Sequence, residues 1–335
     1  MTASAPTGRW RKASERIPAF QPRRPRSIVD LVADPQRAAA RTHRQAVAAM
    51  VLCTLLWSIA GVITRHLHRH DGGVLVFWRS GFAALSLLLV LGARRGPAAL
   101  LRQVFAPTGG GAALLWLSGL CWGVMYTAFM VALSLTTVAQ TLVAESLGPL
   151  FAALMGLLFL GVPVRARTWV AIGVAMLGMA WMFWNNLHAS SGAREVVGLL
   201  IGLLVPVAAA GNWVALRHAG ARLPMQLAPM LGAALSAASM GLFTSARLAV
   251  DLHDLGWLAV LGVFQLALPG AFAVWAAQRL APAEVALLGL LEVVFGTLWA
   301  WLGAAEVPST STLLGGGLIL AALVGNELLA STRSR

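Results

Sequence analysis

Charged residues are scarce in this sequence. Only 11% of the residues are Asp, Glu, Lys or Arg, compared with about a quarter in soluble globular proteins. Hydrophobic residues instead make up 59% of the chain, and the mean hydropathy is +0.77. This composition excludes an ordinary soluble domain and indicates a protein that crosses a membrane several times.

The sequence also has few cysteines and no nucleotide-binding motif. Cys53 and Cys121 are the two cysteines and both lie in apolar runs, so no disulfide framework or cysteine-ligated zinc site is expected. The sequence contains no GxxxxGK[ST] phosphate-binding loop and no polar segment long enough for a soluble domain. We therefore expect no enzyme activity, no cofactor and no nucleotide-driven pump, so that uphill transport would use an ion or solute gradient.

The positive charge is concentrated near the start of the chain. The formal net charge is +13, and ten of the 25 basic residues lie within residues 1–45. A polybasic segment that leads into a membrane helix is attracted to anionic lipid headgroups, and the prolines in this segment favour disorder over a nucleic-acid-binding domain. We predict a disordered basic cytoplasmic tail over 1–45 that contacts lipid and no nucleic acid.

Ten apolar runs of about 20 residues follow the tail, each long enough for an α-helix to cross the hydrocarbon core. The predicted spans are 46–66, 73–92, 111–133, 137–160, 168–185, 196–216, 226–247, 256–278, 281–304 and 311–330. With the tail inside, the short loops and the C-terminus carry ten basic residues on the cytoplasmic side and four on the other side. The positive-inside rule then predicts a bacterial inner-membrane protein with both termini in the cytoplasm.

The chain also contains an internal repeat. A shift of 144 in the numbering places Thr168 on Thr312 and Gly173 on Gly317, and the predicted repeats are 46–186 and 194–330, followed by a C-terminus of residues 331–335. Five spans per repeat is an odd number, so the second repeat enters the membrane from the opposite side. Inverted repeats of this kind recur in secondary transporters, whose solute site lies near the membrane midplane between the repeats.

Several short motifs accompany the repeat: Trp57, Phe77-Trp78-Arg79, Pro149, Glu292, the hinge at Glu306, Thr312 and Gly315–Gly317. With these motifs, residues 46–330 resemble an EamA-type transporter of the drug/metabolite transporter superfamily. The resemblance implies a substrate among amino acids, other metabolites or drug-like compounds, often exported. The sequence departs from the family pattern at Val162, where Glu is usual, and at Val293, where proline often follows the glutamate.

Three charged side chains lie well inside the predicted spans, where charge is costly. Arg79 and Glu145 are predicted at similar depth. They either face a central cavity, where they bind a zwitterionic or anionic solute or exchange a proton, or they form a structural ion pair; Arg79 could also snorkel to the outer side. Glu292 is predicted close to the midplane, as part of the same site or as a group hydrogen-bonded within a helix interface.

Neutral polar and aromatic residues at mid-depth are further candidates. We expect Trp57, Trp122, Tyr126 and Gln265 to line the cavity, with Asn212 as another polar residue at that depth. Trp122 and Gln265 occupy equivalent positions in the two repeats and could meet near the pseudo-two-fold axis.

Three histidines alternate after the first span. His66 and His70 share a helix face beside His68 and Asp71, which is a possible ligand spacing for a metal ion. Polar residues commonly follow a span, however, and no metal site is predicted here.

The sequence thus predicts an all-α polytopic secondary transporter, an exporter or exchanger of a small organic solute that works by alternating access, with protons as a candidate coupling ion. Two other classes were weighed. A membrane-embedded enzyme would need a cluster of His, Asp or Glu near an interface, and only the His66–Asp71 group is visible. A non-transporting scaffold or sensor would have to act through the basic tail. Nothing in the sequence indicates an oligomeric state.

Overall fold

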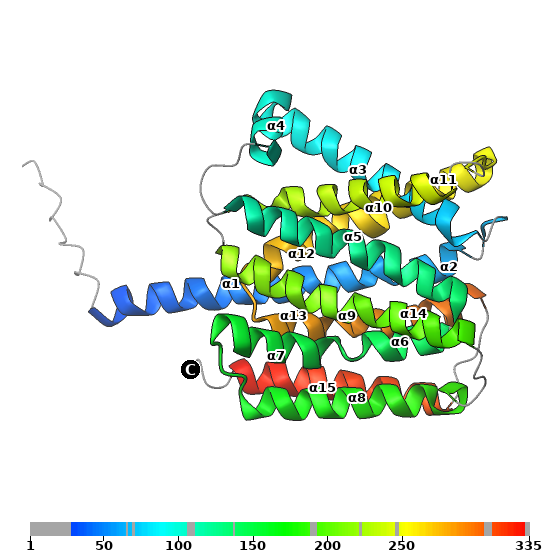
Figure 1. The fold of residues 1–335 in the computed structure, drawn as a ribbon. Helices are drawn as coiled ribbons and strands as arrows, with labels where there is room; N and C mark the ends of the chain where they lie inside the picture. The colour runs from blue at the N-terminus through cyan, green and yellow to red at the C-terminus, as the bar shows by residue number, and fades with distance from the viewer. Residues whose placement is uncertain are drawn as a thin grey trace, which may run out of the picture. The chain divides into compact units, whose positions relative to one another are not determined.

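The computed structural model describes residues 28–64, 66–68, 71–105, 111–136, 138–187, 193–220, 223–244, 248–304 and 310–331. Within these ranges all regular secondary structure is helical (Figure 1), as the sequence predicts. The elements in chain order are α1 (Ile28–Trp57), α2 (Ala60–Thr64), α3 (Gly72–Arg95), α4 (Pro97–Phe105), α5 (Gly111–Leu135), α6 (Val138–Glu145), α7 (Gly148–Leu160), α8 (Ala166–Leu187), α9 (Ala193–Ala219), the 3₁₀ turn η2 (Met225–Leu227), α10 (Ala228–Thr244), α11 (Leu252–Val260), the π-helix η4 (Leu261–Ala267), α12 (Leu268–Ala277), α13 (Pro282–Gly289), α14 (Leu291–Ala304) and α15 (Thr310–Ser331).

The chain divides into two compact units, residues 1–39 and residues 40–335. Residues 1–27 of the predicted tail lie outside the described residues. Residues 28–45, which the sequence assigns to the disordered tail, are instead the first part of α1. The alanine-rich segment 38–49 has high helix propensity, which extends the helix back from the apolar run.

Seven segments of the described chain are long and apolar enough to cross a membrane: Ala38–Thr64, Gly72–Arg95, Gly111–Ala132, Ala193–Ala219, Met225–Thr244, Leu252–Ala277 and Pro282–Trp299. Three shorter apolar helices, Gly148–Leu160, Ala166–Trp181 and Thr310–Asn326, coincide with the remaining predicted spans. The protein therefore crosses a membrane several times, and the count of ten spans stays a prediction.

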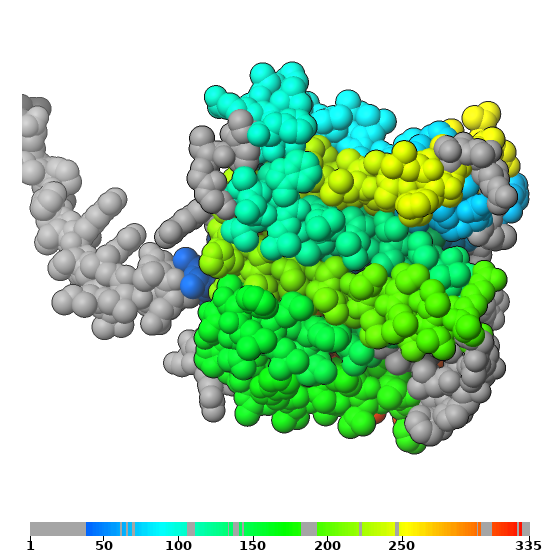
Figure 2. All heavy atoms as spheres, viewed as in Figure 1, coloured from blue at the N-terminus to red at the C-terminus, as the bar shows by residue number. Residues whose placement is uncertain are grey.

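Within residues 40–335 the long helices lie side by side along one direction (Figure 1). Helix α5 packs against α9 and α10, α3 packs against α10, and α8 packs against α15. The outer surface carries large apolar side chains, such as Leu158, Phe159, Leu242 and Phe243, which are more than 70% exposed. Figure 2 shows one face of this surface, formed largely by α5, α7, α8 and α9 in shades of green. An apolar outer surface of this kind suits contact with lipid.

Four predicted spans are interrupted where the sequence predicts continuous α-helices. The first is divided between α1 and α2, the fourth between α6 and α7, and the ninth between α13 and α14, while the eighth contains the π-helix η4. The interruption after α6 begins at Ser146 and the one after α13 is at Leu290. These two positions are 144 residues apart, the same shift that relates the two sequence repeats.

Proline explains two of the interruptions. Pro149 begins the first turn of α7 and Pro269 the first turn of α12. Proline has no amide hydrogen, and its ring clashes with the carbonyl group four residues earlier, so it displaces that carbonyl from the helix ladder. In this chain those carbonyl groups belong to Glu145 and Gln265, two of the predicted site residues.

The contact between α3 and η4 depends on the absence of a side chain at Gly262. A Cβ atom there would lie 2.6 Å from the carbonyl oxygen of Arg79 and 2.5 Å from Cβ of Phe82. Gly262→Ala should therefore destabilise the protein by about 1–3 kcal/mol through overpacking, measured as a lower melting temperature in detergent. Gly81→Ala is the matched control, because nothing lies within 4 Å of a Cβ at Gly81 in α3 and alanine is the better helix former. Equal melting temperatures for Gly262→Ala and the wild type would contradict this account of the α3–η4 contact.

A buried hydrogen bond joins α5 to α9. The hydroxyl of Ser118 donates to Oδ1 of Asn212 at 2.6 Å, and neither side chain is exposed. Asn212→Ala leaves that hydroxyl without its acceptor and should cost about 1 kcal/mol. A double-mutant cycle with Ser118→Ala, followed by thermal unfolding, should give a coupling energy of similar size. Additive effects of the two substitutions would show that the bond contributes nothing to stability.

Candidate functional site

A cavity of about 100 Å³ lies at the helix interruptions. Its walls come from α1, α3, α5, α6, α9, η4 and α14, and they are formed by Trp57, Arg79, Trp122, Met125, Tyr126, Phe129, Glu145, Val205, Gln265, Leu266 and Glu292. Seven of the eight residues predicted from the sequence are therefore brought together in one place. They come from segments more than 200 residues apart in the chain, and only tertiary packing joins them.

Several of these side chains lie at or near the ends of the interrupted helices. Trp57 is the last residue of α1, Glu145 is the last residue of α6, and Glu292 is the second residue of α14. Gln265 lies within the π-helix η4, a type of segment that is frequent at functional sites. Irregular backbone at membrane depth is tolerated where it lines a cavity or is buried in protein.

Arg79 is the charged group on α3 that faces this cavity. It is 2% exposed, and one terminal guanidinium nitrogen donates to the backbone carbonyl of Tyr126 at 3.1 Å. Its Nε atom is buried without a hydrogen-bond partner in the described part of the chain. No carboxylate oxygen of Glu145 or Glu292 lies within 4.0 Å of the guanidinium nitrogens, so the alternative of a direct Arg79–Glu145 ion pair is absent from this structure, as is snorkelling of Arg79 to the surface.

Glu145 and Glu292 contribute the two carboxyl groups of the cavity. Both line the same cavity as Arg79. Glu145 comes from the first sequence repeat and Glu292 from the second. The cavity thus holds one permanent positive charge and two carboxyl groups.

Aromatic rings form one wall. The ring of Trp122 lies 6.4 Å from that of Trp57 and 5.4 Å from that of Tyr126, measured between centroids. Trp122 is 1% exposed, and its indole nitrogen has no hydrogen-bond partner among the described residues. This wall therefore combines apolar ring faces with one unpaired N–H donor.

Gln265 adds a polar group beside the aromatic wall. Its Nε2 atom donates to the backbone carbonyl of Trp57 at 3.4 Å, a carbonyl at the end of α1. Its Oε1 atom is buried without a partner in the described ranges. Gln265 and Trp122 occupy equivalent positions in the two sequence repeats, and both line the cavity.

Asn212 is the one predicted residue that does not line the cavity. It lies between α5 and α9, where it is hydrogen-bonded to Ser118. The position of Asn212 along its predicted span indicates its depth in the membrane but not the helix face on which it lies. Sequence analysis also missed Met125, Phe129, Val205 and Leu266. Met125 and Phe129 share one face of α5 with Trp122 and Tyr126 at helical spacing, a signal that could have identified them.

Comparisons with known proteins agree with this architecture. The model of the EamA-like transporter family matches residues 44–184 and 196–326. The pseudopaline exporter CntI of Pseudomonas aeruginosa, in strains UCBPP-PA14 and PAO1, is 28% identical over 253 residues, which covers 75% of this chain and 84% of the exporter. A solved crystal structure of a protein superposes with a TM-score of 0.65 at 20% identity, over 87% of this chain and 99% of its own, and this likeness concerns the fold alone.

The two family matches together cover most of the chain, and they follow the two sequence repeats closely. The chain therefore belongs to the EamA-like transporter family and is a multi-pass membrane transporter rather than an enzyme.

Proposed function

We propose that this protein is a secondary transporter that exports or exchanges a small organic solute with both a carboxylate and an amino group, and that the cavity described above is its binding site. The observation that carries the proposal is the grouping of Arg79, Glu145 and Glu292 with unpaired buried polar atoms in one cavity. Intramembrane ionisable residues that face a cavity commonly mark solute or proton pathways.

The charge balance of the cavity supports a solute of this class. Two ionised carboxylates beside one arginine leave one negative charge, and a buried charge needs a partner. A solute ammonium group or a proton can supply it at Glu145 or Glu292. The free Nε–H of Arg79 and the indole N–H of Trp122 are donors suited to a solute carboxylate, since charge-assisted hydrogen bonds are strong.

Similarity to a pseudopaline exporter supports export as the direction and a small organic molecule as the cargo. The aromatic rings of Trp57, Trp122 and Tyr126 favour a solute that also has an apolar or planar part. The substrate is proposed here only as a chemical class.

The proposed architecture has ten spans in two inverted five-helix repeats, with both termini in the cytoplasm of the inner membrane. The interruptions at Ser146 and Leu290, related by the repeat shift, support this arrangement. In transporters with inverted repeats, interrupted helices near the midplane form the solute site, and one repeat rocks against the other.

Alternating access would have to enlarge the cavity. At about 100 Å³ it is smaller than the ~300–1,000 Å³ of typical ligand pockets. Admission of a solute therefore requires the surrounding helices to separate, and the interrupted segments are suitable hinges because hinge motion is usually absorbed by a few residues at the ends of elements. We propose that a gradient of protons or of the solute itself supplies the energy.

Proteoliposomes that contain the purified protein test this function. Solute counterflow, screened over amino acids and related zwitterions with and without an imposed pH gradient, should identify a substrate that moves only when protein is present. If no solute in the screen were transported by protein shown to be folded and inserted, transport of this class of solute would be contradicted.

The carboxyl groups can be tested with matched substitutions. Glu145→Gln and Glu292→Gln each remove an ionisable group from the cavity, and we expect counterflow to fall by at least about tenfold, the value of one charge-assisted hydrogen bond of ~1.5 kcal/mol to the solute. Glu284→Gln is the control. Glu284 lies on the same predicted span as Glu292 but outside the cavity, and it accepts from the backbone N–H of Ala281, a role that glutamine can also fill. Wild-type rates in both cavity variants would remove these residues from the mechanism.

The unpaired indole N–H gives a test that separates binding from folding. Trp122→Phe removes a donor that has no partner among the described residues, so we expect the melting temperature to fall no further than in the packing control, while the KM for the solute rises about fivefold, the value of one hydrogen bond of ~1 kcal/mol. Trp213→Phe is the control, because Trp213 packs edge-on against Trp122 at 5.7 Å but does not line the cavity. A KM that rises equally in both variants would indicate a packing effect instead.

A further inference from the structure

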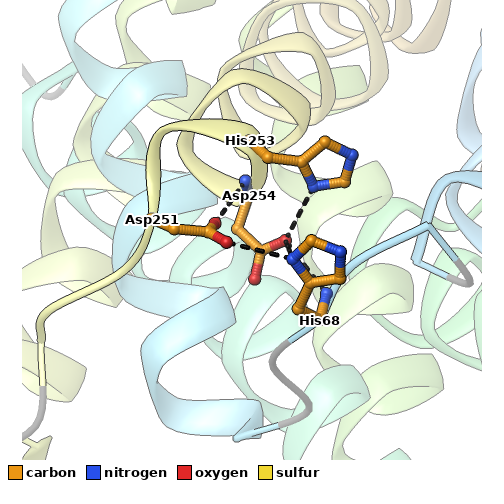
Figure 3. Close-up of side chains that lie close together, drawn as sticks. All are labelled: His68, Asp251, His253 and Asp254. Atoms are coloured by element: carbon orange, nitrogen blue, oxygen red, sulfur yellow. Dashed lines mark hydrogen bonds and ion pairs between the residues drawn. The ribbon is translucent and has the colours of Figure 1, made fainter.

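A second group of polar side chains lies at one end of the bundle, apart from the cavity. His68 comes from the segment between α2 and α3, while Asp251, His253 and Asp254 come from the start of α11 (Figure 3). One nitrogen or oxygen atom from each of the four residues lies within 4.8 Å of the others. His68 and the α11 residues are more than 180 residues apart in the chain.

From this geometry we infer that His68, Asp251, His253 and Asp254 form a binding site for one divalent transition-metal ion such as Zn²⁺. Imidazole nitrogen and carboxylate oxygen together are ligands that zinc accepts. No metal site was predicted from the sequence, where His68 was grouped with its neighbours His66 and His70. The proposal uses a different set of partners for His68, which only the fold brings together.

The spacing of the donor atoms suits such an ion. Nδ1 of His68 lies 3.0 Å from Oδ2 of Asp251 and 3.9 Å from Oδ1 of Asp254, and Nδ1 of His253 lies 3.3 Å from the same Asp254 oxygen. Zinc bonds of about 2.0–2.2 Å place neighbouring tetrahedral ligands roughly 3.3–3.5 Å apart. Small side-chain rotations are therefore sufficient to close the four donors around one ion.

Backbone hydrogen bonds hold the carboxylates in position. Oδ1 of Asp251 accepts from the backbone N–H of Asp254 at 2.8 Å as the N-cap of α11, and Oδ1 of Asp254 accepts from the backbone N–H of His68 at 2.9 Å. Asp254 is 1% exposed, whereas both histidines are open to solvent. Such outer bonds orient the ligands of metal sites and reduce the entropy lost on binding.

The two imidazole rings lie in parallel beside the carboxylates. The rings of His68 and His253 are stacked, with centroids 4.5 Å apart and an angle of 18° between planes, and both Nδ1 atoms lie near the same Asp254 oxygen (Figure 3). The cluster borders a surface hollow of about 370 Å³ lined by His68, Ala249, Val250, Asp251 and Asp254. An ion can reach the ligands through this hollow.

Hydrogen bonds and ion pairs join the four side chains in this structure. The hydrogen bond to Asp251 raises the pKa of His68, and the same bond lowers the pKa of Asp251. Exposed ion pairs of this kind contribute little to stability. A metal ion shared by all four side chains would instead link the segment before α3, in the first family match, to α11 in the second.

Zinc titration of the full-length protein tests the site. Protein purified in detergent without a polyhistidine tag, and stripped with a chelator that is then removed, should bind one Zn²⁺ per chain in isothermal titration calorimetry. His68→Ala and His253→Ala should each weaken the affinity by at least about tenfold, the lower limit expected for loss of a group that supports a metal. Saturating Zn²⁺ should raise the melting temperature of the wild type and leave that of His68→Ala unchanged.

His66→Ala is the matched control, because His66 is an exposed histidine in the same segment and its Nδ1 atom contacts the Val62 carbonyl at 3.0 Å instead. Its zinc affinity should equal that of the wild type. Co²⁺ provides a second readout, since visible d–d absorption reports ligation directly and should be lost in His253→Ala. Absence of zinc binding by the folded wild type, or equal affinities for wild type, His68→Ala and His253→Ala, would overturn the proposal.

Discussion

The burial of the Arg79 guanidinium is the constraint on which the central site depends. A cation among apolar helices is costly, and at 2% exposure Arg79 is shielded from bulk water. Its hydrogen bond to the Tyr126 carbonyl satisfies one donor, and the carboxyl groups that line the same cavity are those of Glu145 and Glu292. Because Arg79 and Glu145 belong to the first repeat and Glu292 to the second, the two halves have to pack together before all three groups line one cavity.

The helix interruptions place further polar groups at the same cavity. A continuous α-helix satisfies its own backbone and presents only side chains, whereas an interrupted helix exposes carbonyl and amide groups that must find partners. The Trp57 carbonyl finds one in Gln265. Pro149 and Pro269 lie four residues after Glu145 and Gln265, so each proline affects the backbone carbonyl of a residue that also lines the cavity.

The two repeats are related without being equivalent. Both have an interruption at the corresponding position, but Pro149 accompanies the first and Val293 occupies the corresponding place in the second. Glu292 corresponds to Gly148, and the π-helix η4 corresponds to part of the regular helix α5. The two repeats thus contribute different side chains to the cavity.

Both clusters of polar side chains join the two halves of the chain. The cavity does so within the bundle, through residues of α1, α3, α5 and α6 against η4 and α14. The His68–Asp254 cluster does so at one end, where Trp78 also donates to the Leu248 carbonyl at 2.9 Å. Any movement of one half against the other must change the contacts at both places, since each consists of residues from both halves.

The sequence by itself determined the apolar helical class, the repeat and the rarity of buried charge, because hydrophobic run length and composition are local properties that the membrane imposes directly. It also marked Arg79, Glu145 and Glu292 as charged residues within apolar runs, and all three line the cavity. It did not place the interruptions at Trp57 and Leu290, where no proline signals a break. Only the tertiary structure separated Asn212, bonded between α5 and α9, from the cavity residues at similar depth, because the direction of a side chain depends on how neighbouring helices pack. For the same reason, only the tertiary structure paired His68 with Asp251, His253 and Asp254, which the chain separates by more than 180 residues.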